Sequence, residues 1–167
     1  MTEVRVRPAT AADIPAILAL VKELATFERD PDSAVATPPL MYDALFGPGP
    51  VAHAIMAEAD NEPLGFALYF FNFSTWTGRR GLYLEDFYVR PGARGLGVGR
   101  KLFAHLATIA EECGCGRMEL AVLTWNENAI RFYERAGGAA LDDWKHYRFD
   151  VDTIAKIAAM NSDNGAA

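Results

Sequence analysis

The spacing of hydrophobic residues predicts strands and helices in alternation along the first half of the chain. Hydrophobic side chains recur every three or four positions from Ile14 to Ala25, directly after a capping-box-like start at Thr10-Ala-Ala-Asp13, which predicts a helix. Alternation of hydrophobic and polar residues predicts strands near residues 3–8, 51–58, 64–73 and 81–90, with a proline-containing loop at 30–39 and a short helix at 39–46 between the first two. The short connections between the last three strands favour an antiparallel meander.

The second half of the chain continues this pattern. Leu102, Phe103 and Leu106 fall on one face of a helix that Gly114 and Gly116 end. The further elements predicted are a strand at 117–123, a short helix that starts at Asn126, one or two strands at 139–150 and a terminal helix at 152–160. We therefore expect one α/β (α+β) domain over residues 1–167, with a mixed, mostly antiparallel sheet flanked by helices and a frayed tail at 161–167.

Composition and charge narrow the classes of function. The chain has 167 residues, of which 51% are hydrophobic and 23% charged, and its net charge is −6. An acidic chain argues against nucleic acid as a partner, because phosphate binding needs a basic face. The N-terminus has no apolar signal-peptide core, and the longest apolar run, Leu64 to Phe71, is too short to cross a membrane. We expect a cytoplasmic protein with no membrane partner.

The cysteine and histidine residues predict no metal site. Cys113 and Cys115 form a C-x-C pair, and the three histidines lie scattered without the spacing of metal ligands. The two cysteines are therefore interpreted as ordinary thiols near a helix end, in a reducing compartment.

The stretch from Tyr83 to Lys101 carries the candidate chemistry. It reads as an apolar strand that contains Glu85 and Asp86, followed by a basic glycine-rich turn and a helix. The N–H groups at the start of a helix have no partner within it, and the helix dipole favours negative charge there. Glycine lets the main chain approach a ligand, and Arg94 and Arg100 add positive charge. The pattern predicts a pyrophosphate site at the turn, with chemistry on the strand before it.

The glycine turn also resembles a known signature. Arg94-Gly-Leu-Gly-Val-Gly99 fits the pattern R-x-x-G-x-G between a strand and a helix. Together with Asn126 and Phe132-Tyr-Glu-Arg-Ala-Gly137, it resembles the acyl-CoA signature of the GNAT superfamily of N-acetyltransferases, and the predicted order of elements is similar to that fold. The resemblance implies that acetyl-CoA is the co-substrate and that an amine attacks it directly in a ternary complex, without a metal.

Further segments resemble a narrower branch of this superfamily, the diamine (spermidine/spermine-type) acetyltransferases, which includes enzymes that act on thialysine. The similarity covers about residues 3–150 and rests on Arg7-Pro-Ala-Thr-Ala-Ala-Asp13, Lys22-Glu-Leu-Ala25, Tyr83-Leu-Glu-Asp-Phe87 and Ala121-Val-Leu-Thr-Trp-Asn126. Ser74 departs from the pattern, because polyamine-preferring members carry an acidic residue there. A long polyamine needs a carboxylate for its distal ammonium, so we expect a short amine, or an amino acid with a side-chain amine such as thialysine, lysine or ornithine.

The resemblance also assigns the acyl-CoA side of the site. Main-chain N–H groups of the glycine turn hold the CoA pyrophosphate, and a free N–H at Val89 or a neighbour stabilises the oxyanion. Tyr133 is the general acid that protonates the leaving thiolate, and Asn126 both caps its helix and contacts CoA. The expected cofactor contacts are Phe87, Tyr88, Val89, Arg94, Gly95, Leu96, Gly97, Val98, Gly99, Arg100, Asn126 and Tyr133.

The amine side is expected to be acidic. A primary amine arrives as an ammonium with a pKa of about 10.4 and must lose a proton before it attacks. Glu85 matches the base of the branch, acting through water, while Glu28, Trp76, Glu85 and Asp86 are the expected substrate contacts. Glu85 and Asp86 are neighbours in sequence, so a regular strand turns them to opposite faces and they cannot both line one pocket.

Two alternative functions stay open at this point, and we also expect the chain to form an oligomer. An acetyltransferase for a protein N-terminus or lysine shares the same chemistry. A non-catalytic acyl-CoA-binding domain shares the fold, but it needs neither Glu85 nor Tyr133. By analogy with the branch, we expect a homodimer in which C-terminal segments pack across the partner, with the aromatic-rich Trp144-Lys-His-Tyr-Arg-Phe149 as the segment involved.

Overall fold

A computed structural model describes residues 3–161 of the chain. The chain forms two compact units, residues 1–123 and 124–167. The tail predicted to fray at 161–167 lies outside the described residues from position 162 onward. The expectation of a single domain over 1–167 stays a prediction.

The first unit is built on a five-stranded sheet in the order β1-β2-β3-β4-β5. Its strands are β1 (Arg5–Pro8), β2 (His53–Ala59), β3 (Glu62–Ser74), β4 (Arg79–Val89) and β5 (Met118–Leu120). Neighbouring strands are antiparallel from β1 to β4, and β5 joins β4 in parallel. The predicted mixed, mostly antiparallel sheet and its central meander are confirmed, although β5 is shorter than the strand expected at 117–123.

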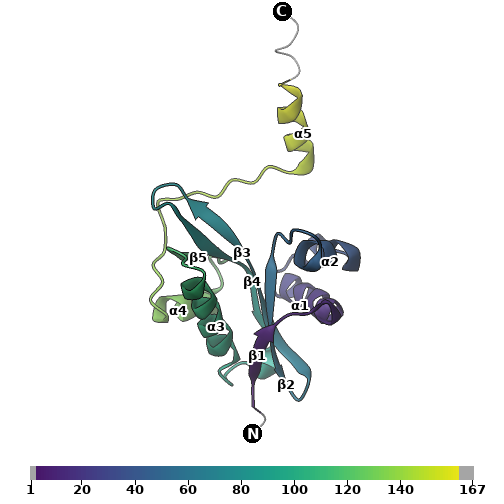
Figure 1. The fold of residues 1–167 in the computed structure, drawn as a ribbon, viewed down its shortest axis with the longest axis vertical. Coiled ribbons are helices and arrows are strands. Elements are labelled where there is room, and N and C mark those ends of the chain that lie inside the picture. The colour runs from purple at the N-terminus through teal and green to yellow at the C-terminus, as the bar shows by residue number, and fades with distance from the viewer. Residues whose placement is uncertain (1–2, 162–167) are drawn as a thin grey trace, which may run out of the picture. The chain divides into compact units, whose positions relative to one another are not determined.

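Helices cover both faces of this sheet, as Figure 1 shows. The helical elements of the first unit are η1 (Ala11–Asp13), α1 (Ile14–Phe27), η2 (Pro31–Ser33), α2 (Pro38–Phe46), η3 (Pro91–Ala93) and α3 (Val98–Glu112). On one face α1 buries Ile17 and Leu20, and α2 buries Leu45, in a cluster with Phe66. On the other face α3 buries Leu102 and Leu106 in a second cluster. Burial of these side chains removes apolar surface from water on both sides, which fixes the sheet between two layers.

The second unit contains α4 (Glu127–Arg135) and α5 (Val151–Ala159). Asp150 caps α5, because its carboxylate accepts a hydrogen bond from the Thr153 N–H at 2.8 Å. The strands predicted at 139–150 are wrong, since these residues form neither strand nor helix and all of them are exposed. Their alternation of hydrophobic residues resembles a strand, but a strand needs a neighbour for its main-chain hydrogen bonds, and no described residue supplies one.

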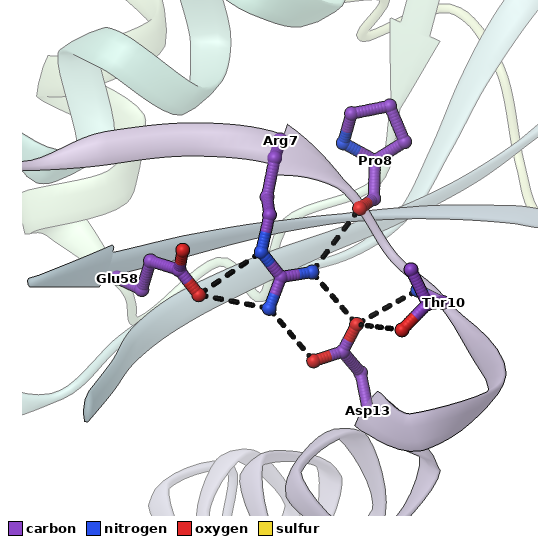
Figure 2. Close-up of polar contacts among 5 residues, drawn as sticks. All are labelled: Arg7, Pro8, Thr10, Asp13 and Glu58. Carbon is purple, nitrogen blue, oxygen red and sulfur yellow. Dashed lines mark hydrogen bonds and ion pairs between the residues drawn. The ribbon is translucent and has the colours of Figure 1, made fainter. Parts of the chain in front are cut away.

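An ion-pair network fixes the first strand to the start of α1 (Figure 2). The Arg7 guanidinium donates to both oxygens of Asp13, at 2.7 and 2.9 Å, and to Glu58 on β2 at 3.0 Å. The same Asp13 carboxylate accepts the Thr10 N–H at 2.7 Å, which closes the first helical turn. Hydrogen bonds from Arg7 lower the pKa of Asp13 to about 2. The segment from Arg7 to Asp13 is therefore a structural clamp between β1, β2 and the helical layer.

Replacing Asp13 with Asn is expected to lower the free energy of unfolding by about 2 kcal/mol near pH 7, because a carboxylate with a depressed pKa stabilises the fold while it is ionised. The folded pKa lies below the ordinary value of 3.8, so the stabilisation is complete above that value and disappears as the pH falls through about 2. Urea unfolding at several pH values measures it, with Asp43→Asn on the exposed side of α2 as the control. Equal stability of Asp13→Asn and the native chain near pH 7 would contradict this role.

Candidate active site

A β-bulge in β4 lies at the centre of the candidate site. Leu68 on β3 pairs with Asp86, but the next residue, Tyr69, pairs with Leu84. Glu85 is therefore one extra residue on β4 without a counterpart on β3. A bulge of this kind bends the strand and re-aims its side chains and main chain, which is why bulges are frequent beside functional sites.

The bulge turns both acidic residues of β4 to the same face of the sheet. Leu84 and Phe87 both pack in the cluster beneath α3. They are three positions apart, and a regular strand would turn residues at that spacing to opposite faces. Glu85 and Asp86, which lie between them, therefore both face the side of the sheet that α1 covers. The expectation that a regular strand keeps these two carboxylates on opposite faces fails here, because β4 is not regular at this point.

The two carboxylates form an acidic cluster with the end of α1. Burial, the charge of Glu85 and the charge of Glu28 raise the pKa of Asp86 to about 6. Glu28 follows the last residue of α1, and burial raises its pKa as well. After burial, the charges of Glu85 and Glu28 disfavour ionisation of Asp86, so a cation placed beside it is stabilised. The structure thus brings together the acids Glu28, Glu85 and Asp86 that the sequence singled out.

The bulge also marks the point where β4 loses its second neighbour. Pairing of β4 with β5 ends at Leu84, whereas β4 itself continues to Val89. The Arg90 N–H donates to Leu64 O on β3 at 2.9 Å, so by alternation Val89 points its main chain to the opposite, open edge. Because β5 does not reach Val89, the main chain of this residue can offer its N–H group to a ligand.

Tyr88 differs from its two neighbours on β4. Its side chain is buried in the cluster beneath α1 and α2. By the same alternation its main chain faces β3, where it pairs with Phe66. Its expected contact with a cofactor stays a prediction, and the geometry favours Val89 over Tyr88 as the residue that presents its main chain.

The glycine turn follows directly after this edge. Gly95 and Gly97 have φ angles of +82° and +77°, which L-residues with side chains rarely adopt, and Gly97 caps the start of α3. The first main-chain N–H groups of α3 have no acceptor within the helix, so the turn presents donors to an anion. The side chain of Val98 is buried in the core, so only its main chain is available there.

The turn is held against β4 and the end of α1. A side-chain atom at Gly99 would lie 3.8 Å from the Phe87 ring and 3.9 Å from Val89, so α3 starts directly on the open segment of β4. Arg94 donates from Nε to Val89 O at 3.1 Å, and its guanidinium lies 5.1 Å from the centre of the Phe27 ring. The acidic cluster therefore lies at one end of the β4 segment from Glu85 to Val89, and the predicted anion site lies at the other end.

Two predicted site residues lie in the second unit. The Asn126 side chain accepts the Ala129 N–H at 3.3 Å, so this residue caps α4 as predicted. Tyr133 lies in the last turns of α4, and burial raises its pKa to about 12. A tyrosine with so high a pKa stays protonated at neutral pH and can act as a proton donor.

Trp76 is not brought to the acidic cluster. It lies in the turn between β3 and β4, where it is 93% exposed, and most of the length of β4 separates it from Glu85. Ser74, at the end of β3, is buried and its hydroxyl accepts the Thr77 N–H at 3.4 Å. Among residues 3–161, Trp76 neither packs on the sheet nor lines the cluster, and its predicted contact with substrate stays a prediction.

Sequence reasoning gave no role to Tyr83, which lies beside Glu85 on the same face. Burial, then the charges of Glu85 and Glu119, raise the pKa of Tyr83. The signal was present in the sequence, because Tyr83 and Glu85 are two positions apart on a strand and so share a face. The adjacent strand that brings Glu119 to Tyr83 could not be aligned without the structure.

Two general features of the described residues concern metals and membranes. Between residues 3 and 161, no three His, Cys, Asp or Glu side chains are grouped so that they could hold a metal ion. No helix in that same range has the length and apolar character required to cross a bilayer. The cytoplasmic location expected from the sequence stays a prediction.

The chain is similar to proteins of one known family, both in sequence and in structure. Residues 17–138 match the acetyltransferase (GNAT) family. A thialysine N-epsilon-acetyltransferase of Sus scrofa is 36% identical, over 95% of this chain and 99% of that protein. A spermidine/spermine N(1)-acetyltransferase-like protein 1 of Homo sapiens is 34% identical over 92% of this chain, and the match covers 24% of the human protein. A solved integron cassette protein from the mobile metagenome of V. cholerae has a TM-score of 0.78 and 27% identity, over 95% of this chain and 98% of that one.

The acidic cluster predicts an unusual titration of Asp86. NMR of the side-chain carboxyl carbon should give a pKa of about 6 for Asp86, and Glu28→Gln should lower it because a neighbouring negative charge is removed. Because folding raises the pKa of Asp86, the native chain loses stability as the pH rises from about 4 to about 6. Asp86→Asn does not have this loss, so it should be more stable than the native chain only above that range. Glu112→Gln, at the exposed end of α3, is the control. A native Asp86 that titrates at its ordinary value would contradict the cluster.

Proposed function

The chain belongs to the GNAT acetyltransferase family and is an acetyl-CoA-dependent N-acetyltransferase, and on that premise we propose that it acetylates the primary amine of a small molecule by direct attack in a ternary complex. One observation carries this proposal. The extra residue Glu85 turns a pair of carboxylates toward one face of β4 and coincides with the end of its pairing with β5. An amine and a thioester that meet at this bulge would each find the groups that the reaction needs.

The acidic cluster binds and deprotonates the amine. A primary ammonium with a pKa of about 10.4 is attracted by Glu85, Asp86 and Glu28. Glu85 is exposed, so it can accept the ammonium proton through a water molecule, as the family resemblance implies. Asp86 is less accessible than Glu85, and burial together with its two acidic neighbours raises its pKa to about 6, so an ammonium beside it favours its ionised form and is held there. The neutral amine then attacks the carbonyl carbon of the thioester.

The open segment of β4 and the glycine turn hold acetyl-CoA. Main-chain N–H groups at the start of α3 bind the pyrophosphate, with positive charge from Arg94 and Arg100 nearby. The main chain of Val89 faces the open edge, so its N–H can donate to the thioester carbonyl and stabilise the oxyanion that forms during attack. Arg94 already binds Val89 O, which fixes the orientation of this peptide. The turn and the strand thus align the cofactor along β4.

Tyr133 supplies the proton that the leaving thiolate needs. Its raised pKa keeps the phenol protonated until the carbon–sulfur bond breaks, and the proton then moves from the phenol oxygen to the CoA sulfur. Asn126 caps the helix that carries Tyr133, which orients this residue and leaves the Asn126 amide nitrogen for a contact with CoA. This pair of roles follows the family resemblance.

The substrate we favour is a short amine, or an amino acid with a side-chain amine. The relative from Sus scrofa is named for thialysine, an amino acid of this kind. Ser74 cannot supply a negative charge for the distal ammonium of a long polyamine, and its hydroxyl is buried in the β3–β4 connection. We place this reaction in the cytoplasm, as expected for a chain of this composition.

We also propose that the protein acts as a homodimer. In the second unit, Trp144, Tyr147 and Phe149 are each more than half exposed, in a segment without secondary structure of its own. A run of exposed aromatic side chains is typical of a protein–protein contact. Sedimentation at micromolar protein should give the mass of two chains, and truncation after Gly138 should give a monomer. A native chain that sediments as a monomer would contradict the dimer.

A thiol-release assay tests the reaction. With acetyl-CoA, the native chain should release CoA when short diamines or basic amino acids are added, and Tyr133→Phe should lower kcat about 100-fold with little change in CoA affinity, because only proton donation is lost. Tyr42→Phe, on the exposed side of α2, is the matched control.

Three other outcomes of this assay would be informative. Unchanged turnover of Tyr133→Phe at saturating substrate would remove this residue from the mechanism. Release only with peptides would favour a protein acetyltransferase, and binding of acetyl-CoA without release would favour a non-catalytic domain.

A further inference from the structure

A second polar cluster lies on the same face of the sheet as Glu85. On β5, Met118 and Leu120 pack in the cluster beneath α3, so the alternating residue Glu119 points to the opposite face. There Arg117 Nε lies 3.0 Å from Glu119 Oε2, and the Asn72 side-chain nitrogen donates to the same oxygen at 3.2 Å. Neither Arg117 nor Glu119 has a role in the mechanism proposed above.

The packing around this cluster is close. Asn72 Oδ1 is buried and has no hydrogen-bond partner among the described residues, although an unsatisfied buried carbonyl lowers stability. A side chain at Gly81 would collide with this oxygen and with Arg117, so glycine is what lets the group assemble over β4. An arrangement maintained at a cost in stability is frequently functional. The charged atoms stay accessible, with side-chain exposures of 44% for Arg117 and 27% for Glu119.

Tyr83 connects the polar cluster to the acidic cluster. It pairs with Glu119 across β4 and β5, and burial, followed by the charges of Glu85 and Glu119, raises its pKa. The Phe70 ring lies 5.1 Å from the Tyr83 ring, so the two aromatic side chains form an apolar surface between the charged groups. Strand geometry places the Cα atoms of Glu85 and Glu119 roughly 8 Å apart. A lysine-like side chain extends roughly 6 Å from its terminal nitrogen to the α-carbon, which is roughly 2 Å less than this span, so the side chains of Glu85 and Glu119 must reach over the difference.

We propose that Arg117, Glu119 and Asn72 bind the head group of an α-amino acid whose side-chain amine reaches Glu85. The Arg117 guanidinium pairs with the α-carboxylate, and Glu119 accepts hydrogen bonds from the α-ammonium. The alkyl chain of the substrate lies over Phe70 and Tyr83. This inference rests on the proposed acetyltransferase function and names its substrate class, an amino acid rather than a simple diamine.

A surface ion pair without a ligand is the competing explanation. Such pairs contribute little to stability and confer no preference among substrates. The two explanations differ in one respect, since only a head-group site discriminates between an amino acid and the diamine obtained by removing its carboxylate. L-lysine and 1,5-diaminopentane form such a pair, because their chains have the same length and only lysine carries a carboxylate.

The test compares these two amines in the thiol-release assay. For Arg117→Met, KM for L-lysine should rise about 10- to 100-fold, as loss of a charge-assisted contact implies, while KM for 1,5-diaminopentane and both kcat values change less than about twofold. Arg117→Lys should restore part of the lysine affinity. Arg5→Met, on the exposed side of β1, is the matched control. An equal change for both amines, or an unchanged KM for lysine, would overturn the head-group site.

Failure of the proposed function gives a different result. If the native chain releases no thiol with any amine, the acetyltransferase proposal fails first. Calorimetric titration of L-lysine into the chain saturated with CoA then tests the cluster alone. Binding that Arg117→Met abolishes and Arg5→Met preserves supports the site, and binding that is absent or unaffected by Arg117→Met overturns it.

Discussion

One extra residue in β4 is the constraint on which the rest of the site depends. Leu84 and Phe87 must both reach the core beneath α3, and two residues, Glu85 and Asp86, lie between them. A regular strand cannot satisfy this spacing, so β4 bulges at Glu85. The consequence is a pair of neighbouring carboxylates on one face, where burial and then the charge of Glu85 raise the pKa of Asp86. The burial of apolar residues elsewhere in the core maintains this otherwise unfavourable concentration of charge.

The same bulge connects the amine side of the site to the cofactor side. Beyond Glu85, β4 runs to Val89 without β5 beside it, and its open edge leads to the glycine turn. Arg94 links that turn to Val89 and to the end of α1. In the other direction Tyr83 leads from Glu85 to Glu119 and the polar cluster. An amine, a thioester and a substrate head group can therefore be aligned along consecutive residues of one strand.

Features set by short-range sequence patterns could be predicted, whereas those set by partner strands could not. The helix starts, the cap at Asn126 and the left-handed glycines follow from residue type and spacing alone. The bulge does not follow from the sequence, because an extra residue on β4 is defined only by how this strand pairs with β3. The strands expected at 139–150 failed for a different reason, since alternation predicts a strand only where a neighbour completes its hydrogen bonds.

Deletion of Glu85 tests the importance of the bulge most directly. Without this residue, Leu84, Asp86 and Phe87 keep their faces in a regular strand, so the core is preserved and the chain should still unfold cooperatively. Glu85→Ala is the matched comparison, because it removes the carboxylate but keeps the bulge. We expect the deletion to lower the rate of acetyl transfer at least tenfold more than Glu85→Ala does, which corresponds to about 1.4 kcal/mol. Equal turnover by the two variants, with the deletion variant folded, would contradict the central role of the bulge.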